Sequence, residues 1–162
     1  DMATETISRL TQFENIIGIK DSTGDLGRIN EIQKKVGSGF TQLCGEDPLT
    51  FSYLEQGGHG CISVTSNIAP SLCSAVYNYY QKGKTIDARD LSAALSPIHS
   101  AMFYETSPQP VKYALFRMGL CSDEMRLPMV RASQECRIAV DRAIDTLNEI
   151  LHEQEEQSQA TG

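Results

Sequence analysis

The chain has 162 residues, of which 40% are hydrophobic and 22% charged, a composition typical of a folded domain with a sizeable core. Its net charge of -7 and its lack of a basic cluster argue against nucleic acid as a partner, because phosphate binding needs a Lys and Arg patch. No apolar run reaches membrane-spanning length, and the first residues lack the pattern of a signal peptide. We therefore expect a cytoplasmic protein without a membrane partner.

The five cysteines are widely spaced and give no sign of a metal site. Neither a Cys-x-x-Cys nor a His-x-x-x-His pair occurs, so the sequence does not predict zinc. Three of the cysteines lie within apolar segments, where a free thiol behaves as a small hydrophobic group. We expect reduced thiols in the core.

The first two thirds of the chain alternate strand and helix patterns. A helix is predicted over 5–12, followed by a strand over 15–20 that is almost continuously apolar, as in a strand covered on both faces. A polar loop over 21–25 then leads to apolar residues at helical spacing over 26–36. This order gives one strand–loop–helix unit.

The same unit occurs twice more. The second has a strand over 40–44 and a helix beginning at Pro48 with Asp47 as its N-cap, and the third has a strand over 61–65 and a helix beginning at Pro70. Such a repeat predicts parallel βαβ units, whose right-handed crossovers bring all strand C-termini to one edge. Lys20, Gly45 and the 63–65 stretch should meet there, where α/β folds bind ligands.

After Gly83 the pattern indicates helices only. We expect a long helix over 86–102 with a kink at Pro97, a helix over 111–118, and a last helix with apolar residues from 136 to 151. The predicted regions are therefore an α/β part over 1–83, a helical region over 84–152 and a disordered polar tail over 153–162. Patterning alone leaves open whether the three strands form a small open sheet or part of a barrel.

Lys20 is the most informative single residue, because it ends an apolar strand at the predicted ligand edge. Burial of its stem would disfavour the ammonium form and lower the pKa, which would make the amine a nucleophile for ketones. The resulting protonated imine would serve as an electron sink. The alternative is a lysine that directs its amine from the strand end into solvent.

Several motifs in order resemble the dihydrodipicolinate synthase and N-acetylneuraminate lyase superfamily. Residues 16–25 (IIGIKDSTGD) resemble its Schiff-base strand, and residues 44–47 (CGED) are similar to its Ser-Gly-Asp-Asp loop. Residues 57–67 (GGHGCISVTSN) resemble the Gly-Gly-x-Gly-x-Ile-Ser-Val-x-x-Asn signature, and 105–112 (ETSPQPVK) resemble the Glu-x-Asn-Pro-x-Pro-Val-Lys loop of the synthase branch. Residues 118–120 and 127–128 match the closing helices.

The resemblance implies a (β/α)8 barrel, of which this chain would supply the last three βα units and the C-terminal helical region. It implies that Lys20 forms the imine and that the backbones of Gly45 and Ile62 lie against bound pyruvate. It also implies that no metal or organic cofactor is needed, since the lysine is the electron sink. For Ser63 and Thr65 two roles stay open: a role in the site, or that of ordinary hydroxyls in a β-sheet.

The activity implied is that of a lyase which condenses pyruvate with aspartate semialdehyde to 4-hydroxy-tetrahydrodipicolinate in lysine (diaminopimelate) biosynthesis. The parent enzyme is expected to be a homotetramer. In the family, the proton-shuttling tyrosine, the arginine for the second substrate's carboxylate and the paired threonines lie upstream of the segment seen here. We therefore expect an incomplete site in the chain alone, with the N-terminal half of the barrel as its partner.

Two alternatives stay open. Residues 21–22 (Asp-Ser) replace the commoner Glu-Ala, and Ser107 replaces an asparagine, which allows a lyase or dehydratase for sialic acid or keto-deoxy sugar acids. The Pro-x-Pro-Val-Lys loop favours the synthase instead. The second alternative is a catalytically inactive half-barrel, which should be self-associated or accompanied by its other half because of its open edges.

Two further polar residues are given structural roles. His59 precedes the third strand, at the end of the sheet away from the predicted site, so we expect it to be structural or exposed. Glu105 precedes a proline-rich turn, where it is expected to cap or pair rather than react.

Overall fold

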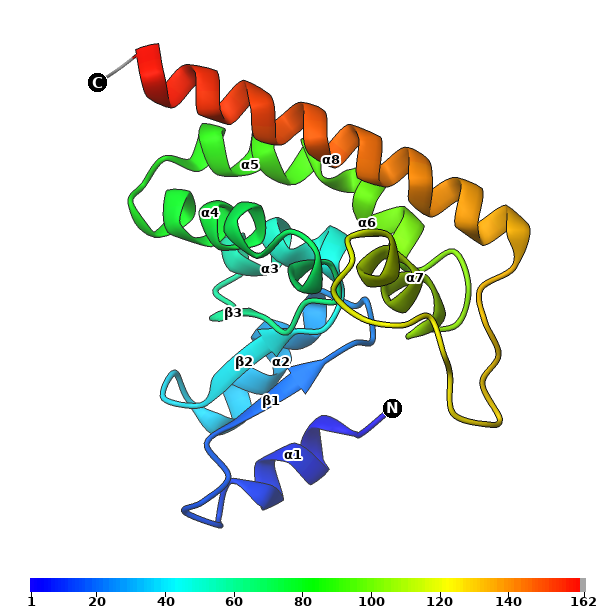
Figure 1. The fold of residues 1–162 in the computed structure, drawn as a ribbon. Helices are drawn as coiled ribbons and strands as arrows, with labels where there is room; N and C mark the ends of the chain where they lie inside the picture. The colour runs from blue at the N-terminus through cyan, green and yellow to red at the C-terminus, as the bar shows by residue number, and fades with distance from the viewer. Residues whose placement is uncertain (161–162) are drawn as a thin grey trace.

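A three-stranded parallel sheet lies at the centre of the α/β part of the chain (Figure 1). The computed structural model describes the backbone of residues 1–160 and the side chains of 1–152 and 156. The strands are β1 (Gly18–Asp21), β2 (Thr41–Cys44) and β3 (Gly60–Cys61), paired in the order β1-β2-β3. All strand C-termini therefore reach the same edge, as the strand–helix repeat predicts.

Helices cover one face of this sheet. They are α1 (Thr4–Leu10), α2 (Gly27–Val36), the 3-10 turn η1 (Asp47–Leu49) and α3 (Thr50–Glu55), and α2 lies behind the sheet in Figure 1. Side chains alternate along β2, so Gln42 and Cys44 are buried toward the helices whereas Leu43 is only half-buried on the other face. Two small apolar clusters fill this layer.

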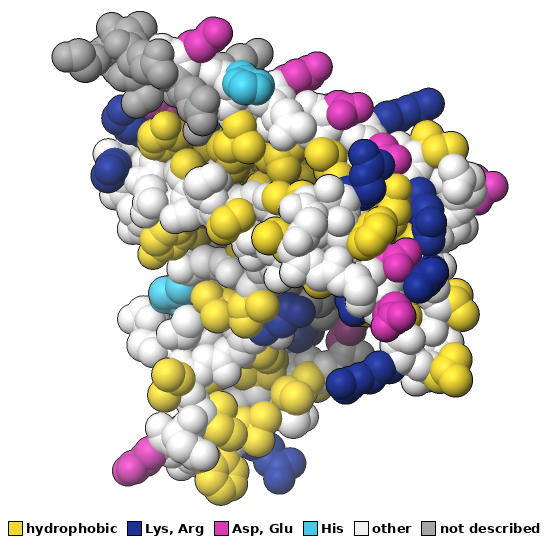
Figure 2. Space-filling view, viewed as in Figure 1, with side chains coloured by type: hydrophobic (Ala, Val, Ile, Leu, Met, Phe, Trp, Pro, Cys, Tyr) yellow, Lys and Arg dark blue, Asp and Glu magenta, His cyan; other side chains and the backbone are white. Residues whose placement is uncertain are grey.

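The opposite face of the sheet is open in the described part of the chain. Lys20 on β1 is exposed and Leu43 on β2 is only half-buried, so the expected coverage of the strand on both faces is not found. Figure 2 shows hydrophobic side chains gathered over the sheet and α1, in the lower half of the view. The apolar sequence of the strand is typical of a strand that is buried on both faces, but the described helices cover only one of them.

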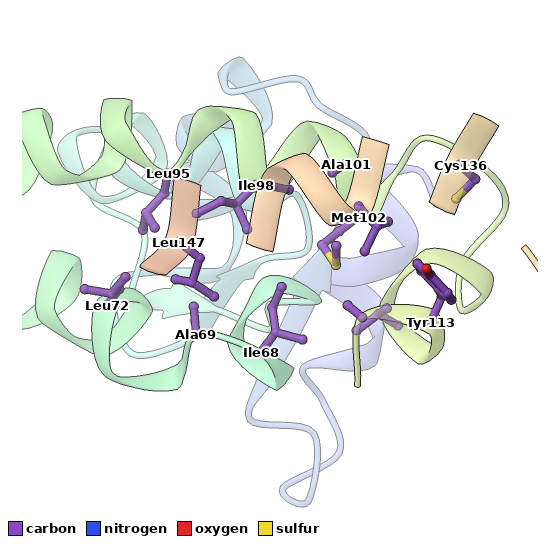
Figure 3. Close-up of a cluster of buried hydrophobic side chains, with 14 of the residues drawn as sticks. Ile68, Ala69, Leu72, Leu95, Ile98, Ala101, Met102, Tyr113, Cys136 and Leu147 are labelled. Atoms are coloured by element: carbon purple, nitrogen blue, oxygen red, sulfur yellow. The ribbon is translucent and has the colours of Figure 1, made fainter. Parts of the chain in front are cut away.

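The main hydrophobic core lies in the helical region, not at the sheet. There, η2 (Thr65–Asn67), α4 (Pro70–Gln81), α5 (Thr85–Ala94), α6 (Ser96–Met102), α7 (Gln109–Arg117) and α8 (Gln134–Ala160) pack together. Figure 3 shows Leu147 of α8 directed toward Leu72, Leu95 and Ile98. No helix within residues 1–160 combines the length and apolar character that a membrane crossing requires.

The third strand is shorter in the structure than the sequence predicts. It was expected over 61–65 but ends at Cys61, and the chain turns into η2 instead. The cause is the carboxylate of Asp47, which accepts the backbone amides of Val64 at 2.8 Å and Thr65 at 3.3 Å. Amides that bond a side chain in this way are not free to extend a ladder.

The helical region differs from expectation at two places. The helix expected over 86–102 is divided at Leu95 into α5 and α6, two residues before Pro97, because proline cannot continue the hydrogen-bonding of the preceding turn. The last helix continues to Ala160, which replaces the expected disorder over 153–160, and its Glu and Gln content favours helix. Residues 161–162 of the expected tail lie outside the described residues.

Candidate functional site

The three residues expected at the site lie at the shared C-terminal edge of the sheet. Lys20 pairs in register with Leu43 on β2, two residues before Gly45. The backbone amide of Gly45 donates to the Asp21 carbonyl at 2.7 Å, and that of Ile62 donates to the Cys44 carbonyl at 2.8 Å. Consecutive strand ends thus hold Lys20, Gly45 and Ile62 in adjacent positions.

Gly45 lies directly against the Lys20 side chain. A methyl group built on Gly45 would lie 2.3 Å from Cε and 3.1 Å from Nζ of Lys20, and 1.9 Å from Oγ of Ser22. No side chain larger than hydrogen fits there without displacing one of these groups. Because Gly45 has no Cβ, the lysine amine can lie over the end of β2.

The surroundings of Lys20 are more open than expected. Its side chain borders a hollow of about 410 Å³ on the open sheet face, together with Gly18, Thr41 and Leu43. Lys20 is exposed, so the expected burial of its stem is not found, because no described element covers that face. Among the described side chains, no group of three or more His, Cys, Asp or Glu residues is arranged to hold a metal ion.

An ion pair fixes the loop after Lys20. Arg28 Nε donates to Asp21 Oδ2 at 2.8 Å, and the Thr23 amide donates to Asp21 Oδ1 at 2.8 Å. Burial tends to raise the pKa of Asp21, but the hydrogen bonds from Arg28 and Thr23 outweigh it, so the pKa lies below its usual value. A carboxylate held in this way anchors the end of β1 to α2.

A buried polar network around Asp47 fixes the loop after Ile62. Asp47 was expected as an N-cap, but it is the first residue of η1, and its carboxylate bonds residues 63–65 instead. The Asp47 carboxylate, 1% exposed, accepts the Ser63 hydroxyl in addition to the amides of Val64 and Thr65. The Thr65 hydroxyl is paired with His99 Nδ1 of α6 at 2.8 Å. Ser63 and Thr65 therefore serve hydrogen bonds within the fold.

His99 connects this loop to the helical region. Its ring is 4% exposed, and Nδ1 lies 3.9 Å from Asp47 Oδ1. Burial lowers the pKa of His99, and the opposing effect of the Asp47 charge is smaller. A neutral imidazole therefore lies among buried acceptors and donors, at the point where α6 meets the strand ends.

The remaining polar residues have structural contacts. His59 is exposed, and its Nδ1 accepts the Gln42 backbone amide at 3.1 Å, immediately before β3. Glu105 accepts the Ser133 amide at 3.2 Å, immediately before α8. This hydrogen bond lowers the pKa of Glu105, and it gives the residue a capping role.

Comparison with known proteins identifies relatives of this chain. A profile of the Dihydrodipicolinate synthetase family matches residues 1–147. The 4-hydroxy-tetrahydrodipicolinate synthase of Gluconobacter oxydans is 43% identical over 147 residues, which are 91% of this chain and 50% of that relative. The same enzyme of Rhodospirillum centenum is 44% identical over 144 residues, 89% of this chain and 50% of that relative.

The solved structures agree with the sequence relatives. The 4-hydroxy-tetrahydrodipicolinate synthase of Methylacidiphilum fumariolicum superposes with a TM-score of 0.92 at 34% identity, covering 96% of this chain and 52% of that one. The chain thus spans about half the length of the relatives it matches. Its fold is the C-terminal part of a (β/α)8 barrel, the last three βα units, followed by a helical region. The chain belongs to the dihydrodipicolinate synthetase family.

Proposed function

We propose that this chain carries the Schiff-base half of a pyruvate-dependent aldolase, with Lys20 as the imine-forming lysine. The observation that carries the proposal is the Lys20 amine over Gly45, at the C-terminal edge of a parallel sheet. In barrels of this kind the C-terminal edge is where catalytic groups gather. The family relatives, named 4-hydroxy-tetrahydrodipicolinate synthases, support aspartate semialdehyde as the second substrate.

Lys20 acts as the nucleophile in the proposed reaction. Its unprotonated amine attacks the keto carbon of pyruvate, and loss of water leaves a protonated imine. That imine withdraws electrons, so the pyruvate methyl group loses a proton to give an enamine, whose carbon attacks the aldehyde. The backbones of Gly45 and Ile62 bound the space beside the lysine, where only small groups fit. The proposal requires no metal or organic cofactor.

Other parts of the reaction need residues beyond this chain. The upstream half of the barrel would supply the proton-shuttling tyrosine, the arginine for the aldehyde's carboxylate and the threonines for pyruvate. We infer that this half docks on the open sheet face, where Ile62 is 52% exposed, and along the β1 edge, beside which Ile17 is 73% exposed. The completed barrel would be a cytoplasmic homotetramer, as in the family the sequence resembles.

One observation favours a second candidate, a lyase for sialic acid or keto-deoxy sugar acids. The Ser22 hydroxyl lies beside Gly45 and Lys20, in place of the commoner alanine, and a hydroxyl there offers a hydrogen bond to a polyhydroxylated substrate. The completed barrel should be assayed with aspartate semialdehyde and with both sugar acids. Preferential turnover of a sugar acid would replace the synthase assignment.

The test of the Schiff base is borohydride trapping. The chain, alone and mixed with the N-terminal half of the Gluconobacter oxydans relative, is incubated with pyruvate, reduced, and analysed by peptide mass spectrometry. We expect an adduct on Lys20, with stronger labelling in the mixture. The Lys20→Arg variant keeps the positive charge and should stay unlabelled. If the completed barrel shows no adduct at Lys20, the Schiff-base proposal is wrong.

A further inference from the structure

Two cysteines face each other at the edge that holds the site. Cys44 of β2 and Cys61 of β3 are register partners on adjacent parallel strands. Both belong to the same apolar cluster with Ile29 and Tyr53, so their side chains point to the same side of the sheet. Each directly precedes a site position, because Cys44 adjoins Gly45 and Cys61 adjoins Ile62.

This placement meets the geometric requirement for a disulfide. Neighbouring strands lie about 4.8 Å apart. Cα atoms joined by a disulfide are usually about 4.4 to 6.8 Å apart, so a bond between register partners needs little backbone movement. All five cysteines are free thiols in this structure. The pair is thus reduced but positioned for oxidation.

The two thiols differ in access and acidity. Cys44 is 1% exposed, whereas Cys61 borders a cavity of about 410 Å³ between β3, α4 and α6. The Cys44 thiol donates to the Glu46 carbonyl at 3.2 Å. The neighbouring Cys61 thiol lowers the pKa of Cys44, and the neighbouring Cys44 thiol, together with burial, raises the pKa of Cys61. The two thiols titrate as a pair, and Cys61 is the one that a small molecule can reach through the cavity.

We propose that Cys44 and Cys61 form a thiol oxidation site, which a small peroxide converts into a reversible intrachain disulfide. Cys61 is the sulfur that a peroxide reaches through the cavity, and Cys44 is the resolving thiol behind it. Formation of the disulfide does not depend on the proposed function. Only its expected effect on pyruvate rests on that function.

The reaction balances with one peroxide. The Cys61 sulfur attacks hydrogen peroxide, so that an S–O bond forms, the O–O bond breaks, and the thiol proton leaves with the hydroxide as water. The Cys44 thiol then attacks the Cys61 sulfur, the S–S bond forms and the S–O bond breaks, and the departing hydroxide takes the Cys44 thiol proton, which gives a second water. The two sulfurs lose two electrons, which the peroxide gains.

The bridge would act on the site through the backbone. Joining the two sulfurs holds together the strand ends that carry Gly45 and Ile62, and Gly45 lies directly against the Lys20 side chain. A shift of about 1 Å at a reacting centre can cost roughly a hundredfold in rate. Oxidation should therefore slow imine formation on Lys20, and a reducing agent should restore it.

The test begins with the chain carrying Cys121→Ser, which removes an exposed thiol that would link molecules. After treatment with hydrogen peroxide and alkylation of the remaining thiols, the chain is cleaved after glutamate, because residues 36–81 contain no Lys or Arg for trypsin. Cleavage at Glu46 separates Cys44 from Cys61. We expect a reducible crosslink between the two peptides, retained in Cys73→Ser and lost in Cys61→Ser.

Cys73 provides the critical comparison, because it borders the same cavity and burial raises its pKa to about 11. Full alkylation of Cys44 and Cys61 after peroxide treatment, or a Cys61 bridge to Cys73, would overturn the proposal. Far-ultraviolet circular dichroism of Cys61→Ser checks that its lost crosslink does not come from unfolding.

A second arm measures borohydride trapping of pyruvate on the barrel completed with the other half. Oxidation should lower labelling of Lys20 roughly tenfold or more and reduction should restore it, while Cys61→Ser stays insensitive. A crosslink that leaves labelling unchanged would overturn the coupling to the site. Absence of labelling in the reduced barrel would instead contradict the Schiff-base proposal and leave the crosslink result standing.

Discussion

Gly45 and Lys20 depend on each other at the scale of single atoms. In Gly45→Ala the new methyl group would lie 2.3 Å from the Lys20 side chain, so the lysine must move away from the end of β2. We expect pyruvate trapping in the completed barrel to fall roughly a hundredfold with the fold retained. Gly39→Ala is the matched control, because a Cβ there meets no atom within 4 Å and labelling should be unchanged. Equal labelling of both variants would show that Gly45 has no such role.

His99 gives the fold a pH dependence whose sign follows from burial. Its pKa is lowered in the folded chain, whereas in the unfolded chain it is about 6.5. Below about pH 6.5 the unfolded chain therefore binds a proton that folded His99 does not, and stability falls as the pH decreases toward the folded pKa. Asp47 and Thr65 are the polar groups that face the ring, and the Asp47 charge limits the effect.

Urea unfolding at pH 7.5 and pH 5.5 measures this contribution. We expect the native chain to lose about 1 kcal/mol more over this interval than His99→Gln, which lacks the titrating ring. An identical loss in both proteins would mean that His99 is protonated in the folded state as readily as in the unfolded one.

At the scale of secondary structure, the Asp21–Arg28 pair joins β1 to α2 near the site. Arg28→Met leaves the largely buried Asp21 carboxylate without its cation, and we expect a loss of about 2 kcal/mol, between the values for exposed and fully buried pairs. Because the pKa of Asp21 is lowered, this stabilisation exists above about pH 4 and disappears as the pH falls through the folded pKa. Urea unfolding of the variant at pH 7 and pH 3 measures both effects.

Lys35 supplies the control for this experiment. It pairs with Glu5 on the exposed side of α1 and α2, where solvent screens the charges. Lys35→Met should change the unfolding midpoint much less than Arg28→Met. Equal effects of the two substitutions would show that burial of Asp21 adds nothing to its pair.

The same elements show what patterning can and cannot predict. The order of strands and helices, and with it the shared edge of Lys20 and Gly45, follows from local periodicity and the handedness of βαβ units, whereas Ile62 was expected there only from the family resemblance. The early end of β3 could not be predicted, because it depends on Asp47, which lies seventeen and eighteen residues before the amides it accepts. The Thr65–His99 contact likewise joins residues 34 positions apart, a packing that no local pattern records.

At the scale of the whole molecule, apolar packing is distributed unevenly. The large core lies among α4 to α8, while only two small clusters hold the helices against one side of the sheet. On the other side Lys20 and Ile62 are exposed to solvent, and Ile17 is exposed just before β1. The outer edges of β1 and β3 have no strand partner among residues 1–160. Such a surface favours pairing with another chain.

We therefore expect the isolated chain to self-associate through its sheet. Sedimentation velocity should show oligomers that grow with concentration and that give way to a defined complex when the N-terminal half of the Gluconobacter oxydans relative is added. Ile17→Lys places a charge beside the β1 edge and should weaken self-association. Ile86, on α5, is similarly exposed at 65%, and Ile86→Lys should leave self-association unchanged. A well-folded monomer that ignores the added half would show that the open face is stable in water, and docking of a second half-barrel would lose its physical basis.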